Sequence, residues 1–405
     1  MVGNKRRLVV LPVVVTGLVL AGCGSKKESS GSSSAKHTVK VSVIAPLSGD
    51  LSAIGLGIRN SVDLAVKQAN DAGKIKDWKI ELDPEDDTAK ADVGAQVASK
   101  VASDAEVAGV IGTYNSSVAL QVAPILQRAS ITMISPGNTN ITLTGRDKIP
   151  NQTRPYDNYF RVCTTDDVQG PFGADFVFDT LGVKKVAVVH DKKVYGQGLT
   201  DAFKAEFTKK GGTITGTETI NPGDKDFSAV ITKIKPEAPQ LLYYGGEYPE
   251  ASLLTAQMKQ AGLNIPLMGG DGIEDKTYIT NGGPAAQGDF ATNVGAPADQ
   301  LNSAKQFISD YNAAGYKEGS SAYGPYAFDA TNVLINAFAK VLPGKDKIDD
   351  AVRRDIINDV QQTQMDGVTG KVSFDKFGDT TVKVLTVYKV SGNDFKPEKT
   401  AAFGS

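Results

Sequence analysis

Three short stretches place polar groups where predicted strands end, and these groups could bind the two charges of a small ligand. In "TYNSSVAL", Ser116 opens a helical segment, so its hydroxyl and the free backbone N–H groups there could hold an anion. In "SPGNTN", Gly137 lets a ligand approach the backbone and Thr139 adds a second hydroxyl. In "GGDGIED", the carboxylate of Asp271 could hold a cation. Taken alone, Ser116 is typical of an N-cap, "SPGNTN" is typical of a turn, and Asp271 is also compatible with a turn-forming aspartate.

Together these groups match a zwitterion. An anion site and a cation site at neighbouring strand ends suit a free α-amino acid, whose carboxylate would meet Ser116 and Thr139. Its ammonium group would meet Asp271. Aromatic side chains would enclose the rest of the ligand, and the candidates are Tyr114, Tyr195 and Tyr323. Taken singly, each tyrosine is also compatible with ordinary packing.

A further carboxylate follows two glycines in "QLLYYGGEYPEA". The glycines permit a sharp turn at a strand end, so Glu247 would face the ligand beside Asp271. Two neighbouring acids either share one cation or hold two, which keeps a lysine- or ornithine-like ligand, or an amide, as alternatives. In the other interpretation, Glu247 points into solvent or caps the helix of "YPEASLL".

The elements that position these residues alternate between short β-branched runs and helix-period segments from Thr38 onward, which is typical of an α/β fold. "VKVSVIA", "WKIELD", "VAGVIG" and "ITMIS" belong to a first series, and "KKVAVVHD", "QLLYYGG" and "IPLMGG" belong to a second series after Asp166. We therefore predict two doubly wound parallel-sheet lobes. Ligands bind outside the carboxyl ends of such strands, where the polar stretches fall. The chain is expected to close with a hairpin in "GKVSFDKFGD" and a last strand in "KVLTVYKV".

Residues 1–22 predict an export signal. The basic stretch "NKRR" precedes an apolar run from Leu8 to Leu20 that is too short to span a bilayer as a stable helix. The run ends in "LAGC", which resembles a bacterial lipobox, so Cys23 is expected to carry lipid, including palmitate, and to become the mature N-terminus. An ordinary secretory signal that contains a cysteine is the alternative, and the paired arginines leave the twin-arginine route open. The Ser- and Gly-rich residues 23–37 predict a flexible tether.

Composition and motifs argue against several functions. The mildly acidic charge balance argues against nucleic acid as a partner. The chain has two histidines, His37 in the tether and His190 at a strand end, and it lacks a G-x-S-x-G elbow, a P-loop and metal-ligand spacings. We therefore predict no catalytic residue, cofactor or metal site, and we interpret Asp271 and Glu274 as loop charges rather than as a glycosidase couple. Cys163 lacks a partner in the mature chain and is expected to be a buried apolar filler.

Several longer stretches resemble one known family. "MISPGNTN", "VHDKKVYGQGL", "DKDFSAVITKIK", "YYGGEYPE" and the lipobox are together similar to the leucine/isoleucine/valine-binding family, the type I periplasmic amino-acid-binding proteins that supply ABC transporters. The resemblance runs from about Val39 to Val390. It implies the type I periplasmic-binding-protein fold, in which three hinge crossings would lie near Thr165, Val294 and Val387. The two lobes would comprise residues 38–165 with 293–386 and residues 166–292 with 387–401.

The resemblance also implies roles for single residues. In the family, the positions of Ser116 and Thr139 hold the ligand carboxylate. The backbone carbonyl at Gly137 and the acid at Asp271 hold the ammonium group, although the best-known members have glutamate at the latter position. The pocket-lining aromatic positions fall on Tyr195 and Tyr323.

Two positions depart from the family pattern. Glu247 stands where the best-known members carry a tyrosine after the two glycines, and Ile54 stands where they carry a pocket tyrosine in the first strand–helix loop. The cysteine pair of some members is absent. These differences bear on which ligand the pocket accepts.

The function implied by the resemblance is capture of a free amino acid, leucine, isoleucine or valine, between two lobes and delivery to an ABC permease. A basic amino acid, an amide or another small polar solute is an alternative ligand. A sensing role, with the protein docked to a receptor, is an alternative function. The protein is expected to be a monomer, lipid-anchored at the extracytoplasmic face of the cell membrane.

Overall fold

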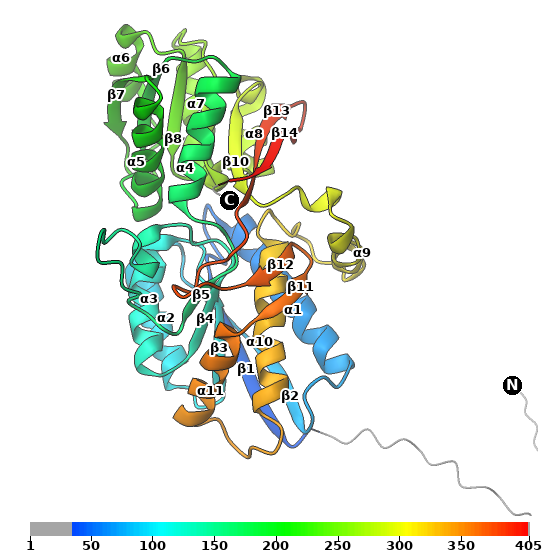
Figure 1. The fold of residues 1–405 in the computed structure, drawn as a ribbon. Coiled ribbons are helices and arrows are strands. Elements are labelled where there is room, and N and C mark those ends of the chain that lie inside the picture. The colour runs from blue at the N-terminus through cyan, green and yellow to red at the C-terminus, as the bar shows by residue number, and fades with distance from the viewer. Residues whose placement is uncertain (1–34, 404–405) are drawn as a thin grey trace, which may run out of the picture. The chain divides into compact units, whose positions relative to one another are not determined.

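The computed structural model describes residues 35–403 (Figure 1). These residues form two mainly parallel β-sheets with accompanying helices and one small two-stranded sheet. The predicted α/β class with parallel-sheet lobes is therefore confirmed. Cys23 and the export signal lie outside the described residues. No helix within 35–403 is both long enough and apolar enough to cross a bilayer.

The first sheet has the strand order β2-β1-β3-β4-β5, and each neighbouring pair in it is parallel. Its strands are β1 (His37–Ala45), β2 (Trp78–Asp86), β3 (Val107–Gly112), β4 (Thr132–Ser135) and β5 (Tyr159–Arg161). Every residue of β3 is buried, as expected for a parallel strand covered on both faces. The helices beside this sheet are α1 (Ser52–Asp71), α2 (Ala91–Ser103), α3 (Ser116–Arg128), α10 (Gly324–Val341) and α11 (Asp350–Gln361). Helix α2 packs against α3, and α1 packs against α10 (Figure 1).

The second sheet has the order β14-β13-β10-β9-β8-β6-β7, in which β13 and β14 are antiparallel to their neighbours and the other pairs are parallel. Its strands are β6 (Lys185–His190), β7 (Thr213–Thr219), β8 (Leu241–Gly245), β9 (Leu267–Gly269), β10 (Phe290–Val294), β13 (Val384–Ser391) and β14 (Asp394–Ala402). The helices that follow its strands or precede them are α4 (Asp166–Asp175), α5 (Val194–Lys209), α6 (Ser228–Ile234), α7 (Tyr248–Gln260) and α8 (Lys276–Gly282). Helix α4 packs along α5. A further helix, α9 (Lys305–Ala313), precedes α10.

The C-terminal region differs from its prediction. The hairpin consists of β11 (Gln364–Gly367) and β12 (Gly370–Ser373), so only the first four residues of "GKVSFDKFGD" lie in it. "KVLTVYKV" is mostly β13, but it is not the last strand, because β14 follows and pairs with it antiparallel. Strand β14 forms the sheet edge and is largely exposed. Its sequence "DFKPEKTAA" therefore lacks the apolar pattern from which a strand could be predicted. Strand β10, "FATNV", was not predicted either.

The crossings between the two sheets also fall slightly away from their predicted positions. Strands β10 and β13 pair along their shared length, with Val294 opposite Leu385 and Asn293 opposite Thr386. The predicted ranges had assigned 293–294 and 384–386 to the first lobe, whereas these residues pair in the second sheet. The rest of the division into lobes stays a prediction.

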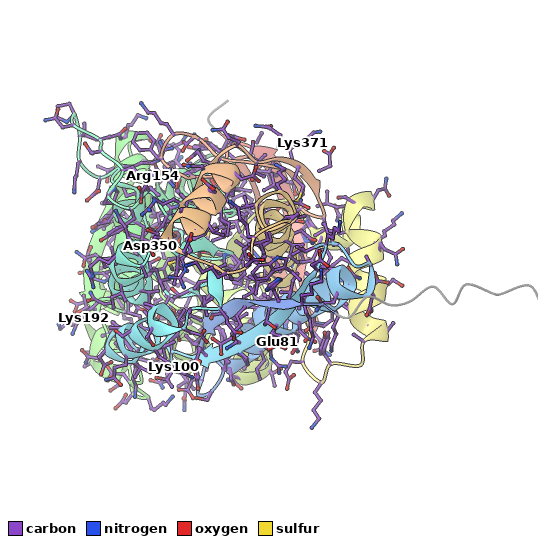
Figure 2. The ribbon with its side chains drawn as sticks, turned by 90° about the horizontal axis from the view of Figure 1, so that it is seen from below. Glu81, Lys100, Arg154, Lys192, Asp350 and Lys371 are labelled. Carbon is purple, nitrogen blue, oxygen red and sulfur yellow. The ribbon has the colours of Figure 1, made fainter. Side chains whose placement is uncertain are left out.

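Charged side chains are spread over the surface, as Figure 2 shows for Glu81, Lys100 and Lys371. Lys371 pairs with Asp366 at 2.5 Å, and 76% and 79% of the two side chains remain exposed. Exposed pairs of this kind add little to stability because water and salt screen them. Ion pairs that stabilise this fold strongly must therefore be buried.

Candidate functional site

Asp271 lies at the centre of the candidate site. It follows β9 and opens a single 3-10 turn, and only 2% of it is exposed. One carboxylate oxygen accepts a hydrogen bond from the Tyr195 hydroxyl at 2.8 Å, and the other accepts one from the Tyr323 hydroxyl at 2.7 Å. Tyr195 comes from α5 and Tyr323 immediately precedes α10. Three of the predicted ligand residues, from three distant parts of the chain, are thus brought into direct contact.

The turn at Asp271 needs glycine beside it. A Cβ atom at Gly272 would lie 2.7 Å from the Gly246 carbonyl oxygen and 3.0 Å from Cε1 of Tyr195. The backbone of Gly272 also donates a hydrogen bond to the Tyr195 hydroxyl at 3.0 Å. Glycine therefore lets the ring of Tyr195 lie against the turn and reach the carboxylate.

The carboxylate of Asp271 carries a charge that the protein does not neutralise. Burial raises the pKa of Asp271 to about 6, although the hydrogen bonds from Tyr323 and Tyr195 act in the opposite direction. The group is therefore ionised at neutral pH. Among residues 35–403, the side chains that bind this carboxylate are the two tyrosines, and no lysine, arginine or histidine pairs with it. A buried anion in this state is a strong site for a cationic group.

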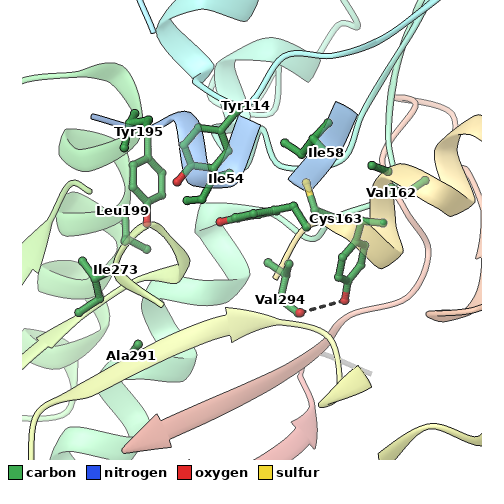
Figure 3. Packing of buried hydrophobic residues seen from close by; sticks show 14 of the residues in the cluster. Ile54, Ile58, Tyr114, Val162, Cys163, Tyr195, Leu199, Ile273, Ala291 and Val294 are labelled. Atoms are coloured by element: carbon green, nitrogen blue, oxygen red, sulfur yellow. Dashed lines mark hydrogen bonds between the residues drawn. The ribbon is translucent and has the colours of Figure 1, made fainter. Parts of the chain in front are cut away.

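Aromatic and apolar side chains surround Asp271. The rings of Tyr114 and Tyr323 meet edge to face, with centroids 5.1 Å apart and an interplanar angle of 69°. A Cβ at Gly137 would lie 3.1 Å from the Tyr323 ring and 3.2 Å from the Tyr114 ring, so this backbone touches both aromatic residues. Ile54 belongs to the same apolar cluster, and Figure 3 shows it beside Tyr114 and Tyr195. Ile54, at the position where the resemblance predicts a loop tyrosine, lies in the first turn of α1 and is buried.

The two predicted hydroxyl donors lie on loops that are tied together. Ser116 is the first residue of α3 and is 2% exposed, and Thr139 is fully buried. The Ser135 hydroxyl donates to the Thr113 carbonyl at 2.9 Å. The Asn138 side-chain amide donates to the Tyr114 carbonyl at 2.8 Å. These bonds fix the loop that follows β4 against the loop that follows β3.

Arg161 supports the Thr139 loop from beneath, and sequence reasoning missed it. Its Nη1 donates at 2.8 Å to the carbonyls of Asn138 and Asn140, the residues on either side of Thr139. Its Nε donates at 2.6 Å to Asp379. Burial acts to lower the pKa of this fully buried arginine, but Asp379 outweighs that effect and the pKa is raised. The signal available in the sequence was a single arginine within the apolar stretch "YFRVC".

Glu247 lies near the site but does not match either sequence interpretation fully. It is 2% exposed, so it does not point into solvent, and its side chain makes no capping hydrogen bond to α7. Its carboxylate instead accepts hydrogen bonds from the Lys193 ammonium group and from the side-chain amide of Asn115. Burial opposes the charge of Lys193, but Glu247 and Asp191 together raise the pKa of Lys193. The negative charge of Glu247 is therefore already balanced within the protein.

Asn115 and Lys193 were not predicted as site residues. Asn115 lies in the strand-end stretch "TYNSSVAL" and Lys193 lies in "VHDKKVYGQGL", one of the stretches that carry the family resemblance, so their place at the site could be anticipated. Their shared partner could not be anticipated, because Glu247 is more than 50 residues from either of them in the sequence.

Loops that follow the first sheet contact loops that follow the second sheet around the site. Hydrogen bonds join Tyr323 to Asp271, Asn115 to Glu247, Ser117 to Val194, Asn140 to Val194, and Tyr248 to Asp50. The Val194 backbone N–H donates to the Ser117 hydroxyl at 3.2 Å, and the Asn140 amide donates to the Val194 carbonyl at 2.9 Å. In this arrangement the two sets of strand ends are closed on each other.

A groove of about 650 Å³ lies elsewhere, beside β10 and β13. Its lining includes Glu274, Asn293, Tyr388, Asp394 and Phe395. None of the nine predicted ligand residues lines it. The size of this groove therefore does not make it the candidate site, which is defined by the polar groups around Asp271.

Two further expectations concern cysteine and metals. Cys163 is fully buried and forms no disulfide, which confirms its predicted place in the apolar interior. Its thiol lies 3.4 Å from the Asn138 carbonyl, beneath the Thr139 loop. Within residues 35–403, no three His, Cys, Asp or Glu side chains are grouped so that they could hold a metal ion.

The sequence matches known proteins over most of its length. A family model described as periplasmic binding protein matches residues 38–395. The Leu/Ile/Val-binding protein homolog 2 of Brucella abortus is 34% identical over 351 residues, which cover 87% of this chain and 90% of the relative. The Leu/Ile/Val-binding protein BraC3 of Rhizobium johnstonii is 32% identical over 356 residues, covering 87% and 91%.

Solved structures match as well. The leucine-binding protein LivK of Thermotoga maritima superposes with a TM-score of 0.79 at 27% identity, covering 89% of this chain and 98% of that one. The branched-chain amino acid transporter substrate-binding protein LivJ of Streptococcus pneumoniae, solved with isoleucine, gives a TM-score of 0.78 at 26% identity, with 90% and 98% covered. The predicted type I periplasmic-binding-protein fold is therefore confirmed.

These relatives are extracytoplasmic solute-binding proteins of transporters, not enzymes. The prediction of a non-enzymatic protein is thereby confirmed, and so is the predicted resemblance. The matched range covers nearly all of both sheets, except most of β14, and every residue of the site around Asp271. The chain belongs to the periplasmic binding protein family.

Proposed function

We propose that this chain is a lipoprotein that captures a free branched-chain amino acid between its two lobes and delivers it to the permease of an ABC importer. The carboxylate of Asp271 supports this proposal most directly. It is buried, it is oriented by two tyrosine hydroxyls, and no cation among residues 35–403 balances it. The ammonium group of an amino acid would supply the missing positive charge.

The opposite side of the site suits the ligand carboxylate. The N-terminus of the 13-residue helix α3 starts at Ser116, and the free N–H groups of a helix start favour an anion. The hydroxyl of Thr139 has no hydrogen-bond partner in the protein although it is fully buried. A ligand carboxylate between Ser116 and Thr139 would satisfy that hydroxyl.

The surroundings of the two charged ends favour an apolar side chain. Ile54, Tyr114 and Ile273 lie in one buried hydrophobic cluster (Figure 3), which also contains Tyr195 and Tyr323, the two partners of Asp271. Glu247 is the one other acid that the sequence predicts at the ligand, and Lys193 already neutralises it. A second ammonium group, as in lysine, would have to compete with Lys193 for Glu247. The names of the relatives, which bind leucine, isoleucine and valine, agree with a neutral ligand.

A basic amino acid or an amide remains the second candidate ligand. Glu247 is buried and bound by Asn115, the residue next to Tyr114. Burial raises the pKa of the Tyr114 hydroxyl, and the charges of Glu247 and Asp271 raise it further. A ligand whose side chain displaces Lys193 would therefore find a second carboxylate within the same site. Ligand competition separates this candidate from leucine, isoleucine and valine.

The lipid anchor and the partner are the parts of the proposal that rest on sequence and family. "LAGC" would place lipid on Cys23 and hold the protein at the extracytoplasmic face of the cell membrane. The closed arrangement of the strand-end loops is the form that a permease would recognise in a capture-and-delivery cycle. A receptor that recognises the same form would make the protein a sensor.

Thermal unfolding in the presence of single amino acids tests the proposal. The chain from Gly24 onward would be heated with each amino acid at about 1 mM, where a ligand at 1,000 times its dissociation constant adds about 4 kcal/mol to the free energy of unfolding. We expect leucine, isoleucine or valine to raise the midpoint. Stabilisation by lysine or glutamine alone would instead support the second candidate, and the absence of any shift with all amino acids would reject the proposal.

Ser116→Ala is expected to weaken binding of the stabilising amino acid without unfolding the protein. A hydrogen bond to a charged group contributes about 2–3 kcal/mol, so the dissociation constant should rise roughly 30- to 150-fold. Isothermal titration calorimetry measures this change. Ser117→Ala is the matched control, because its hydroxyl accepts the Val194 N–H instead of facing the proposed ligand. Equal losses in the two variants would remove Ser116 from the site.

A further inference from the structure

Asp166 is a buried acid that lies beside Thr139. It opens the ten-residue helix α4 and is 1% exposed. Its backbone N–H donates to the Thr139 carbonyl at 2.9 Å. One carboxylate oxygen, Oδ2, accepts a long hydrogen bond of 3.4 Å from the Asn140 amide. The other, Oδ1, has no partner within the protein.

The side chains of Asp166 and Thr139 influence each other directly. The backbone hydrogen bond from Asp166 to Thr139 and the contact of Asp166 with Asn140 hold the two residues beside each other. Burial raises the pKa of Asp166, and the Thr139 hydroxyl acts to lower it. Yet neither Thr139 Oγ1 nor Asp166 Oδ1 completes a well-formed hydrogen bond with any protein group. No other protein group therefore fixes where the protons lie on these two neighbouring buried oxygen atoms.

The number of protons available decides which form of Asp166 is compatible with a bound ligand carboxylate. A threonine hydroxyl has one proton to donate and can accept through its oxygen. If Asp166 is ionised, it competes with the ligand carboxylate for this single proton and also repels the ligand. If Asp166 is protonated, it donates to Thr139 Oγ1, and Thr139 can then donate to the ligand carboxylate.

We propose, on the basis of the proposed function, that Asp166 is a positioning residue that acts in its protonated form and turns the Thr139 hydroxyl toward the carboxylate of the ligand. The relay consists of one proton held on Asp166 Oδ1 and one on Thr139 Oγ1. No bond other than these hydrogen bonds changes. Asp166 thereby makes binding selective for a ligand that carries a carboxylate.

The charges around Asp166 are compatible with the protonated form at neutral pH. Burial raises the pKa of Asp166 to about 8, and the negative charges of Asp271 and Asp167 act in the same direction. The nearby Thr139 hydroxyl and the positive charge of Arg161 act to lower this pKa. Arg161 is itself paired with Asp379, which limits its influence on Asp166.

The charge of Asp166 also acts on two buried tyrosines, Tyr195 and Tyr243. Burial raises the pKa values of Tyr195 and Tyr243 well above 10, so both remain neutral across the range in which Asp166 titrates. The amide of Asn140 is uncharged. The arrival of a ligand carboxylate adds a further negative charge and favours the proton on Asp166 still more.

The test is the pH dependence of leucine binding, measured by isothermal titration calorimetry from pH 6.5 to 9.5 on the wild-type chain and two matched variants. Wild-type affinity should be constant up to about pH 8 and then fall by about tenfold per pH unit, because one proton is required for binding. Asp166→Asn places a permanent donor at this position. It should bind leucine within about threefold of wild type at pH 7 and lose the decline above pH 8, apart from the part due to the ligand's own amine.

Asp167→Asn is the control, because Asp167 is the exposed neighbouring acid on the same helix and is bound by the Thr165 hydroxyl. It should keep the wild-type pH profile. A wild-type profile in Asp166→Asn would overturn the inference, as would loss of leucine binding at pH 7 in an Asp166→Asn protein that melts at the wild-type temperature.

A second measurement needs no variant. Binding to the wild-type protein at pH 8.5, titrated in two buffers of different ionisation enthalpy, should take up part of a proton. Zero uptake would overturn the inference even if Asp166→Asn failed to fold. Failure of the proposed function gives a different result, because no amino acid would then bind the wild-type protein at pH 7.

Discussion

Asp271→Asn is expected to lower the affinity for the amino acid by about 30-fold to several thousandfold, which corresponds to about 2–5 kcal/mol for a buried charge that loses its partner. The substitution keeps the size of the side chain but removes the charge that an ammonium group would meet. It also turns one acceptor of the Tyr195 and Tyr323 hydroxyls into a donor. Isothermal titration calorimetry at pH 7 gives the change in affinity.

Glu247→Gln is the matched control for this experiment. It is the same chemical change in a carboxylate that is equally buried. Because Lys193 already balances Glu247, and because Asp191 lies 3.8 Å from the same ammonium group, the control should change leucine affinity far less. Equal losses in both variants would mean that the ligand uses both acids, as a basic amino acid would. No loss in Asp271→Asn would reject Asp271 as the ammonium site.

The pH dependence of binding at the acid side follows from the same residue. Asp271 must be ionised to hold an ammonium group, and burial raises its pKa to about 6. Affinity should therefore be lost as the pH falls through about 6, and the ammonium group of the ligand should shift this midpoint downward by stabilising the ionised form. In Asp271→Asn the acid-side decline should disappear.

Asp379→Ala is expected to be the most destabilising single substitution considered for this chain. Asp379 is 2% exposed and accepts hydrogen bonds from Arg161, Arg146 and Thr144. Its removal leaves the fully buried Arg161 without a negative partner, which costs about 3–5 kcal/mol in comparable buried pairs. Chemical denaturation should show a lower midpoint with an unchanged slope.

Asp366→Ala is the control for the stability experiment, since its pair with Lys371 is almost fully exposed. Its midpoint should match that of the wild type. Arg161 also holds the carbonyls on both sides of Thr139, so the Asp379→Ala protein should bind leucine more weakly at temperatures where it is still folded. An unchanged midpoint would show that Arg161 finds another partner.

The ion pair between Asp379 and Arg161 also predicts that the stability of the fold falls in acid. Burial acts to raise the pKa of Asp379, but Arg161 and Arg146 outweigh it, so the pKa lies below its ordinary value. A carboxylate with a lowered pKa in the folded state contributes stability above its unfolded pKa of about 4 and loses that contribution as the pH falls below it. The difference in stability between the wild type and Asp379→Ala should therefore shrink in acid.

The position of Asp271 could be predicted because it follows from the fold class. Parallel strands place their carboxyl ends at one edge of a sheet, so residues that follow β6 and β9 in the second sheet must lie near one another. That rule brought Tyr195 and Asp271 together although 76 residues separate them. The same rule located the stretches that contain Ser116 and Thr139.

The partners within the site could not be predicted in the same way. Sequence position shows that Glu247 lies at a strand end, but it does not show that Lys193 and Asn115 bind its carboxylate. Such pairs depend on the side-chain directions of loops from both sheets. Arg161 is a stronger case, because its partner Asp379 lies 218 residues further along the chain and follows a hairpin that was only partly predicted.

The hydrogen bond between Asn115 and Glu247 has a consequence for the speed of capture. It joins loops of the two sheets with the protein's own groups, so the closed arrangement does not depend on a ligand for this contact. A closed population in the empty protein reduces the conformational cost of binding and raises the apparent affinity. A closed molecule cannot admit a new ligand until it opens, so this closed population also lowers the rate at which a ligand binds. We therefore expect substitutions at residues 115 and 247 to change the affinity for a ligand and its rate of binding in opposite directions.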